Sequence, residues 1–332
     1  MSDNLYDVII AGGGPAGLGA ALYASRDRLK TLVIEKLMPG GQINNTDLIE
    51  NYPGIRQTSG LDLTQTMTKQ VQEFGCEFKN GTEITGFERL DDGTIKVITK
   101  KNEYRARAVI LSPGSNYRKL GVPGEDEFRN AGAGVSYCGT CDAPFFRGKR
   151  VVAVGGGNTA LEEAMHLAKF ASDVTLVHRR EEFRATQVLQ EEFSRLAAQQ
   201  DSNLRSRLDT VVEAIEGNGK VERAILKNVK TGEKEAYECD GVFIFVGMVP
   251  NTAFVKDFVD LDSDGFIKCD TAFLRTKVPG VFASGDCRVG AAMQLVTAVA
   301  DGVNAAIAMK HYFRDANWWN KPLKDTHTVG GW

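Results

Sequence analysis

The sequence predicts an α/β protein that contains two similar strand–glycine–helix–strand units. Its 332 residues are 42% hydrophobic and 25% charged, as expected for about two globular domains. Its 35 glycines indicate that the backbone approaches ligands closely at several places. An internal repeat is the most specific observation, because residues 8–25 and 151–168 share one order of apolar, glycine and helix-forming residues. In this repeat Gly12 aligns with Gly155, which predicts two dinucleotide-binding units of the Rossmann type.

The first unit opens with an apolar strand that leads into a glycine turn and a helix. The residues of this turn and helix start are Gly12, Gly14, Pro15, Ala16 and Gly17. Its glycines permit a tight turn and close approach of a pyrophosphate, which the positive end of the helix attracts. Glu35 follows the second strand, where a carboxylate accepts hydrogen bonds from ribose hydroxyls and repels a 2′-phosphate. The pattern suits the adenosine of FAD or NAD.

The second unit has a similar glycine turn but the opposite charge after its second strand. Its turn residues are Gly155, Gly157, Asn158, Thr159 and Ala160. His178 stands where the first unit has Glu35, and three arginines follow it: Arg179, Arg180 and Arg184. Arginine binds phosphate through a charge-assisted fork, so this unit is expected to hold the 2′-phosphate of NADPH. The alternative is a solvated basic helix start.

A third segment has a pattern that could also bind a hydroxyl-rich ligand. Residues 280–286 read as a short apolar strand that ends in Gly285 and Asp286, and helical spacing begins at Gln294. An acid at a strand end beside a helix start can bind the hydroxyls of a ribityl or ribose group. Alone, this pattern is only suggestive.

Cys138 and Cys141 form the single C-x-x-C of the chain, and the other four cysteines are scattered. A structural zinc site would need a second pair or nearby histidines, so a redox pair is favoured. No metal is expected elsewhere either. The segment that begins at Asp260 resembles a calcium loop but has Thr271 where the bidentate glutamate is required.

Charge and hydropathy exclude several other classes of protein. The net charge of −3 argues against a nucleic-acid partner. The longest apolar run, residues 241–249, is much shorter than the ~20 residues of a membrane span. The N-terminus has acidic residues where a signal peptide is basic, so a cytoplasmic location is expected.

The motifs together resemble the low-molecular-weight thioredoxin reductases of bacteria, archaea and plants. The similarity runs from about residue 5 to about residue 314 and rests on eight motifs. They are AGGGPAG near the start, GGQI at 40–43, ENYPG at 50–54, CGTCD at 138–142, GGGNTA at 155–160, HRREEFR at 178–184, GDC at 285–287 and QLVTAVADG at 294–302.

This resemblance implies a class II pyridine nucleotide-disulfide oxidoreductase fold, with the NADPH domain inserted in the FAD domain. The FAD-binding domain would comprise residues 1–117 and 249–314, the NADPH-binding domain 118–248, and an aromatic tail 315–332. Linkers are expected near residues 113–119 and 247–251, where glycine and proline are frequent. The resemblance adds five residues to the flavin site: Gly41, Gln42, Asn51, Gly114 and Gln294.

The resemblance also implies an activity. Electrons would pass from NADPH through FAD to the Cys138–Cys141 disulfide and then to thioredoxin, in a homodimer. Cys141 would face the flavin and Cys138 would attack the substrate. Asp142, beside the pair, would carry the proton; the alternative is that it is simply an acid at a helix N-terminus.

The tail departs from the family. It contains all three tryptophans, Trp318, Trp319 and Trp332, with His327 between them. We expect one of these aromatic side chains to cover the flavin, since flat rings gain by stacking; a tail that only pads the dimer surface is the alternative. The tail leaves two further functions open: a related flavoprotein fed by ferredoxin, with the tail gating the flavin, and a flavin-binding protein with little turnover.

Overall fold

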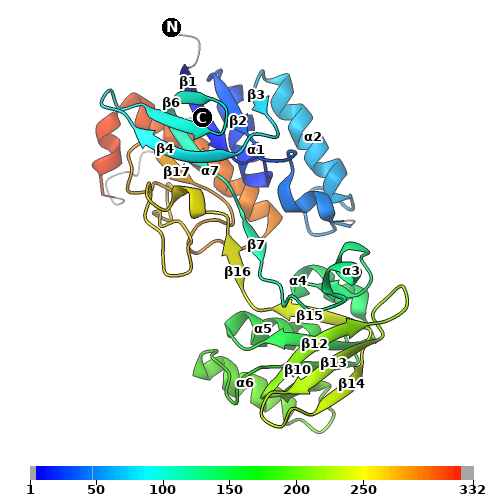
Figure 1. Cartoon of the computed structure of the whole chain (residues 1–332). Coiled ribbons are helices and arrows are strands. Elements are labelled where there is room, and N and C mark those ends of the chain that lie inside the picture. Colours follow the sequence, from blue (N-terminus) through cyan, green and yellow to red (C-terminus); the bar gives the residue numbers. More distant parts are fainter. Residues whose placement is uncertain (1–4, 47, 323–332) are drawn as a thin grey trace. The chain divides into compact units, whose positions relative to one another are not determined.

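The computed structural model describes residues 5–46 and 48–322 of the chain. The chain divides into two compact units: unit one contains the residues up to Asn116 and from Val249 onward, and unit two is Tyr117–Met248. Each unit combines a sheet that is wholly or largely parallel with helices (Figure 1). This architecture confirms the predicted α/β class with two Rossmann-like folds, one inserted in the sequence of the other.

The sheet of unit one has seven strands in the order β3-β2-β1-β6-β5-β4, with β17 beside β6. Their bounds are β1 (Leu5–Ala11), β2 (Thr31–Ile34), β3 (Glu77–Lys79), β4 (Ile84–Arg89), β5 (Ile95–Thr99), β6 (Glu103–Leu111) and β17 (Val281–Ala283). β1 pairs in parallel with β2 and β6. Val8, Ile9 and Ile10 have no exposed surface. Such a continuous buried run is typical of a parallel strand that is covered on both faces.

Two helices of unit one pack closely because glycines lie between them. The helices of this unit are α1 (Pro15–Arg26), α2 (Gly60–Glu73) and α7 (Leu295–Arg314), with the short helices η1 (Gly41–Asn45), η3 (Ala253–Val255) and η4 (Ala316–Asn320). A Cβ atom at Gly302 of α7 would overlap the carbonyl of Ala16 in α1. A Cβ atom at Gly19 would lie 2.7 Å from the carbonyl oxygen of Val299. This contact brings α7 next to the turn that precedes α1.

Unit two has a parallel sheet in the order β11-β10-β9-β15-β8 and a separate antiparallel sheet, β12-β13-β14. The first is made of β8 (Val135–Ser136), β9 (Arg150–Gly155), β10 (Asp173–Val177), β11 (Leu204–Arg207) and β15 (Gly241–Phe245). The second is made of β12 (Thr210–Glu216), β13 (Arg223–Asn228) and β14 (Lys234–Glu238). The helices are α3 (Glu125–Asn130), α4 (Gly139–Asp142), η2 (Ala143–Phe146), α5 (Asn158–Leu167) and α6 (Gln187–Ala197).

The two connections between the units pair with each other. β7 (Ser115–Tyr117) and β16 (Met248–Pro250) form a two-stranded sheet. The amide of Arg118 donates to the carbonyl of Gly247 at 2.9 Å, and the amide of Asn251 donates to that of Gly114 at 3.0 Å. Both connections fall where the sequence predicts linkers.

The described part of the tail packs into the hydrophobic core of unit one. Trp318 and Trp319 in η4 are only 5% and 8% exposed. Trp318 stacks on His311, with ring centroids 5.3 Å apart, and Trp319 meets Phe282 edge to face at 4.9 Å. The Arg275 guanidinium donates to the carbonyls of both tryptophans, at 3.1 and 3.2 Å.

This packing contradicts the expectation that Trp318 or Trp319 covers a flavin. Both indoles lie near the C-terminal end of α7, where Trp318 stacks on His311, about 25 Å along the helix from Gln294, where the flavin was expected. Sequence composition indicated a flat surface for stacking, and the protein's own core supplies that surface. The other two predicted lid residues, His327 and Trp332, lie outside the described residues.

Candidate active site

The predicted redox pair forms a disulfide at the start of a short helix in unit two. Cys138 and Cys141 are bonded, with their Cα atoms 5.3 Å apart, and Cys138 caps the N-terminus of α4. The amide of Cys141 donates to the Cys138 sulfur at 3.2 Å. Cys141 is exposed and Cys138 is partly buried. The arrangement confirms a disulfide in this motif, and within the described residues no cluster of three or more side chains could hold a metal.

The four other cysteines are free and unsuited to thiol exchange. Cys76, Cys239 and Cys287 are buried. Burial raises the pKa of each of these three thiols to about 12, and that of Cys269 to about 11. Exchange requires a thiolate, which these thiols scarcely form near neutral pH.

Asp142 lies in a hydrogen-bond network around the disulfide. Ser136 Oγ donates to Asp142 Oδ2 at 2.6 Å, and the amide of Cys138 donates to Ser136 Oγ at 3.1 Å. The carboxylate is therefore linked to the backbone of Cys138 through one hydroxyl. Sequence analysis missed Ser136, because a serine two residues before the motif has no distinctive spacing.

A second carboxylate, which the sequence analysis also missed, lies against the same turn. Glu163 projects from α5, and Thr140 Oγ1 donates to its Oε1 at 3.0 Å. Its Oε2 is buried and has no hydrogen-bond partner among the described residues. A Cβ atom at Gly139 would overlap Oε2, so glycine at this position lets the carboxylate approach the turn.

The glycine turn of unit one has the geometry that a pyrophosphate requires. Gly12 has φ +110°, and a Cβ atom there would overlap the carbonyl of Ser112. A Cβ atom at Gly17 would overlap the carbonyl of Gly12, so this glycine keeps α1 close to the turn. By contrast, nothing lies within 4 Å of the Cβ position of Gly14. Gly14 is therefore the open point where a phosphate group can approach the backbone.

Glu35 lies beside this turn, as the sequence predicts. Its two carboxylate oxygens accept hydrogen bonds from the amides of Gly13 at 2.7 Å and Leu37 at 2.8 Å. The amide of Gly40 donates to the carbonyl of Gly13 at 2.8 Å, which brings Gly41 next to Gly14. The turn, the acid expected to bind ribose and the Gly40–Gly41 segment thus lie together.

The Gly285–Asp286 turn lies against the start of α1. A Cβ atom at Gly285, which has φ +76°, would lie 2.8 Å from that of Ala16. Asp286 Oδ1 is buried without a hydrogen-bond partner in the described part of the chain. Burial, and secondarily the charge of Asp301, raise the pKa of Asp286 to about 6. A buried oxygen without a protein donor fits a ligand hydroxyl.

Asp301 holds this turn in place and was not predicted. It accepts from the amide of Gly285 at 3.0 Å and from Arg288 Nε at 2.6 Å and Nη2 at 2.9 Å. The signal for it was present in the QLVTAVADG motif, where an acid interrupts the apolar face of the helix.

The remaining residues of the predicted flavin site lie in different environments. Gln42 Nε2 donates to the carbonyl of Ser115 and, at 3.0 Å, to Asn116 Oδ1. These two residues follow Gly114, another predicted residue of the flavin site. Gln294 is the N-cap of α7. Asn51 is exposed. No hydrogen bond connects its side chain to the other predicted residues in the described ranges.

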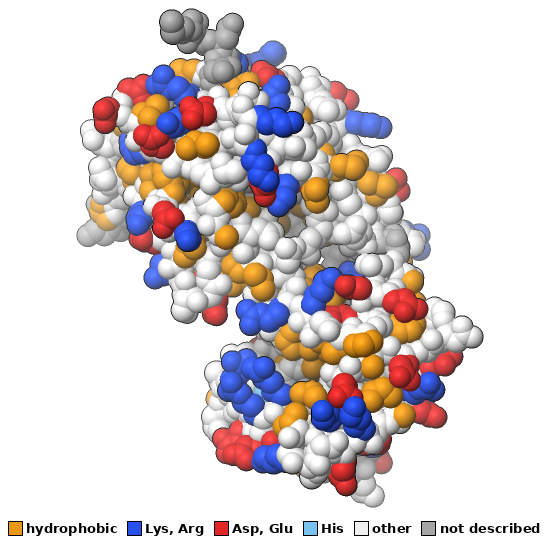
Figure 2. Space-filling model, in the orientation of Figure 1, with side chains coloured by type: hydrophobic (Ala, Val, Ile, Leu, Met, Phe, Trp, Pro, Cys, Tyr) orange, Lys and Arg blue, Asp and Glu red, His pale blue; other side chains and the backbone are white. Residues whose placement is uncertain are grey.

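The predicted arginines of unit two lie at the protein surface. Arg179, Arg180 and Arg184 are exposed, and none forms an ion pair with an acid within the described ranges. The amide of Arg184 donates to the carbonyl of Gly156 at 2.7 Å, which places the arginine segment against the glycine turn. Figure 2 shows Lys and Arg side chains gathered on part of this unit.

His178 differs from the expectation that it adds positive charge. It is only 5% exposed, and a Cβ atom at Gly156 would overlap its ring. Burial lowers its pKa below the usual value, so it is mostly neutral at neutral pH. The positive charge beside this turn therefore comes from the arginines, and His178 packs against Gly156 of the turn.

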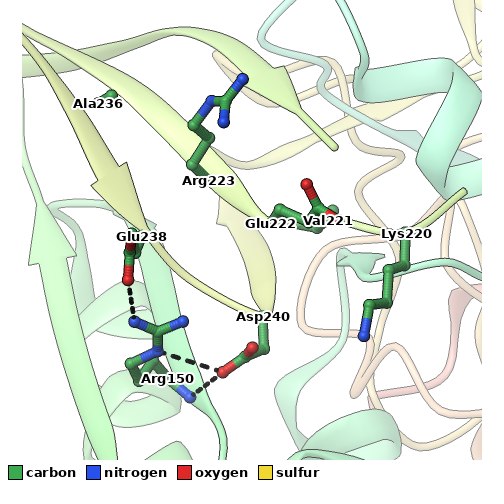
Figure 3. Close-up of a pocket in the computed structure, with 8 residues that line it drawn as sticks. All are labelled: Arg150, Lys220, Val221, Glu222, Arg223, Ala236, Glu238 and Asp240. Carbon is green, nitrogen blue, oxygen red and sulfur yellow. Dashed lines mark hydrogen bonds and ion pairs between the residues drawn. The ribbon is translucent and has the colours of Figure 1, made fainter. Parts of the chain in front are cut away.

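A cavity elsewhere in unit two contains none of the predicted residues. It has a volume of about 460 Å³, and Arg150 at its edge bonds Glu238 Oε2 at 2.8 Å and Asp240 Oδ2 at 3.4 Å (Figure 3). Its charged groups thus partly satisfy one another.

In the described part of the chain, no helix is long and apolar enough to cross a membrane.

Comparison with known proteins shows the family to which the chain belongs. Residues 6–302 match the family described as pyridine nucleotide-disulphide oxidoreductase. The chain is 43% identical over 325 residues to the thioredoxin reductase of Bacillus subtilis. The aligned residues cover 97% of this chain and 99% of that protein. This chain is 45% identical over 318 residues to the thioredoxin reductase of Peptoclostridium acidaminophilum, with 93% and 98% covered. The crystal structure of a thioredoxin reductase from Streptococcus pyogenes superposes with a TM-score of 0.86 at 43% identity, with 94% and 99% covered.

Proposed function

The chain belongs to the pyridine nucleotide-disulphide oxidoreductase family, and on that premise we propose that it reduces thioredoxin with electrons from NADPH. The observation that best supports this function is the Cys138–Cys141 disulfide, with Cys141 exposed, in a chain that also has two dinucleotide-type glycine turns. The family uses a flavin and a nicotinamide; we propose FAD for unit one and NADPH for unit two.

The residues of unit one fit FAD. Gly14 leaves room for a pyrophosphate, Glu35 suits ribose hydroxyls, and Asp286 has a buried oxygen that lacks a partner in the described protein. When bound, FAD supplies two-electron chemistry, because it accepts a hydride from a nicotinamide and passes the electrons to a disulfide. The protein's contribution in this unit is to bind and orient.

The residues of unit two fit NADPH better than NADH. Three exposed arginines without acidic partners in the described residues adjoin the glycine turn. A guanidinium binds a phosphate through two parallel hydrogen bonds, so these residues would hold the 2′-phosphate that NADH lacks.

The dithiol then reduces the partner by exchange. One cysteine thiolate attacks the substrate disulfide to give a mixed disulfide, and the other cysteine displaces the reduced substrate and restores the Cys138–Cys141 bond. Asp142 would accept or return a proton through its network with Ser136. The attacking role of Cys138 stays a prediction, as do the homodimer and the cytoplasmic location.

Turnover tests this function. The FAD-loaded protein is mixed with NADPH and oxidised thioredoxin, and NADPH oxidation is followed by absorbance. We expect turnover by the unmodified protein and none above background by Cys138→Ser or Cys141→Ser, with FAD still bound. If Cys138 attacks, only Cys141→Ser forms a stable mixed disulfide with a thioredoxin variant that has a single active-site cysteine, activated as its thionitrobenzoate disulfide, and releases thionitrobenzoate. Full turnover by either variant would refute the proposal.

Nothing in the described tail favours a ferredoxin-fed reductase. That alternative depended on an aromatic lid, and the two described tryptophans are part of the core.

A further inference from the structure

We propose that Glu163 is a positioning residue that makes the Cys138–Cys141 dithiol a stronger reductant. Its carboxylate lies against the turn that joins the two cysteines, where its negative charge opposes formation of a thiolate. This inference rests on the proposed function, since it concerns the redox couple that the function uses.

The contacts place the carboxylate at the turn itself. Thr140, between the two cysteines, donates from Oγ1 to Glu163 Oε1 at 3.0 Å. The other oxygen lies so close to Gly139 that a Cβ atom there would overlap it. Both residues between the cysteines therefore contact the same carboxylate.

Incomplete hydrogen bonding distinguishes Glu163 from the acids that stabilise this fold. Glu125 is 1% exposed, and donors bond both of its oxygens, among them Tyr137 at 2.6 Å and the Gly121 amide at 2.7 Å. Asp301 is likewise bonded at both oxygens. Glu163 Oε2 has no hydrogen-bond donor in the described residues although it is buried. Such an arrangement costs free energy, so a purely structural role does not explain it.

The negative charge of Glu163 affects the reduced, dithiol form of the cysteine pair and not the disulfide. The disulfide is neutral, and its reduction consumes two electrons and one proton to give a thiol and a thiolate. A nearby carboxylate disfavours the thiolate and therefore favours the disulfide. The dithiol consequently gives up its electrons more readily. Asp142 and Glu162 are the other acids of α4 and α5 near the turn, and Glu162 is exposed.

Gly139 determines how close the charge comes. A methyl group at residue 139 would meet Glu163 Oε2, the end of a flexible side chain, and would push the carboxylate away; it would also lie 3.3 Å from Phe245 Cζ, which must shift by a few tenths of an ångström. Gly139→Ala keeps the charge and moves it, whereas Glu163→Gln keeps the shape and removes the charge. Two chemically different variants thus test one cause.

The experiment measures the dithiol–disulfide equilibrium of the FAD-loaded protein. Each variant is equilibrated without oxygen in mixtures of oxidised and reduced dithiothreitol, at about pH 8, where an ordinary thiol is partly ionised. Free thiols are alkylated, and mass spectrometry of the peptide that contains both cysteines gives the reduced fraction. Neither NADPH nor thioredoxin is needed.

We expect Glu163→Gln to shift the equilibrium about tenfold toward the dithiol, equivalent to about 30 mV. Gly139→Ala should shift it in the same direction, and adding it to Glu163→Gln should have little further effect. Glu162→Gln is the matched control, which should shift it less than about twofold because its charge is exposed and screened.

The inference would be overturned by no shift in Glu163→Gln, by a shift toward the disulfide, or by an equal shift in Glu162→Gln. Full additivity of the Gly139 and Glu163 changes would also overturn it, because it would show separate causes. The proposed function fails differently: the unmodified pair would not interconvert between disulfide and dithiol, or the protein would not turn over with thioredoxin.

Discussion

Asp286 combines burial, a missing hydrogen-bond partner and a perturbed pKa. Its pKa is raised to about 6, first by burial and then by the charge of Asp301. The folded protein therefore favours the protonated acid more than the unfolded chain does. Asp286 therefore favours the folded state fully at a pH below 3.8, its pKa in the unfolded chain. This contribution to the free energy of unfolding is lost as the pH rises through about 6, its pKa in the folded protein.

We therefore expect Asp286→Asn to stabilise the FAD-free protein at pH 7 by roughly 2 kcal/mol, since it removes a buried charge. The advantage should vanish near pH 4. Urea unfolding of both proteins across this range measures the difference, and the same variant should bind FAD more weakly. A stability difference that does not change with pH would contradict the assigned cause.

The arginines of unit two should decide which nucleotide binds. Replacing Arg179 and Arg180 with glutamine should weaken NADPH binding by about 10²–10⁴-fold, because each of the two charge-assisted hydrogen bonds lost contributes about 1.5–3 kcal/mol. NADH binding should change little, and Kd values from fluorescence titration check both. Arg195→Gln, on the exposed face of α6, is the control. Equal affinity of the unmodified protein for NADPH and NADH would refute the assignment.

Single residues also show what sequence can and cannot reveal. Glu35 and the arginines were predictable because they stand at a fixed distance from a glycine turn. The contacts of Asp301 and Glu163 were not, because their partners lie 16 and 23 residues away and only the fold brings them together. The pattern placed His178 correctly but could not show that burial would neutralise it.

Glycines in the elements of unit one have two separate roles, and substitution can separate them. Gly302→Ala should destabilise the protein by about 1–3 kcal/mol, because the new methyl group meets the backbone of α1. Gly14→Ala meets nothing within 4 Å, so it should leave the stability of the FAD-free protein almost unchanged and weaken FAD binding. Urea unfolding and FAD titration measure the two effects. If both variants lost stability equally, the assignment of Gly14 to ligand approach would be wrong.

The short helix η4 should act as a structural element. Trp319→Ala should cost about 3–5 kcal/mol of stability, since it leaves a cavity beside Phe282. Flavin fluorescence and the rate of flavin reduction by NADPH should stay the same. Trp319→Phe should recover part of the stability. A faster reduction by NADPH in Trp319→Ala would instead support the lid that the sequence suggested.

Most helices and strands around the sites could be predicted from the sequence, because the spacing of apolar residues and the glycine turns depend only on residues that are close together in the chain. The tail could not. Three tryptophans show that a segment gains by burial, but its binding surface depends on α7 and on Arg275, 43 residues from Trp318.

The described part of the molecule contains two Rossmann-like folds, joined by two paired connections, and one disulfide in unit two. If electrons pass from NADPH through the flavin to Cys138–Cys141, the protein has two separate two-electron acceptors. Loss of either cysteine removes one acceptor and leaves the flavin.

Anaerobic titration of the FAD-loaded protein with NADPH, followed by flavin absorbance, tests this claim most directly. We predict that the unmodified protein bleaches fully only after two equivalents of NADPH, one for each acceptor. Cys138→Ser should bleach after one equivalent, with the same FAD content. Identical end points for the two proteins would contradict the claim, because the disulfide would then receive no electrons from the flavin.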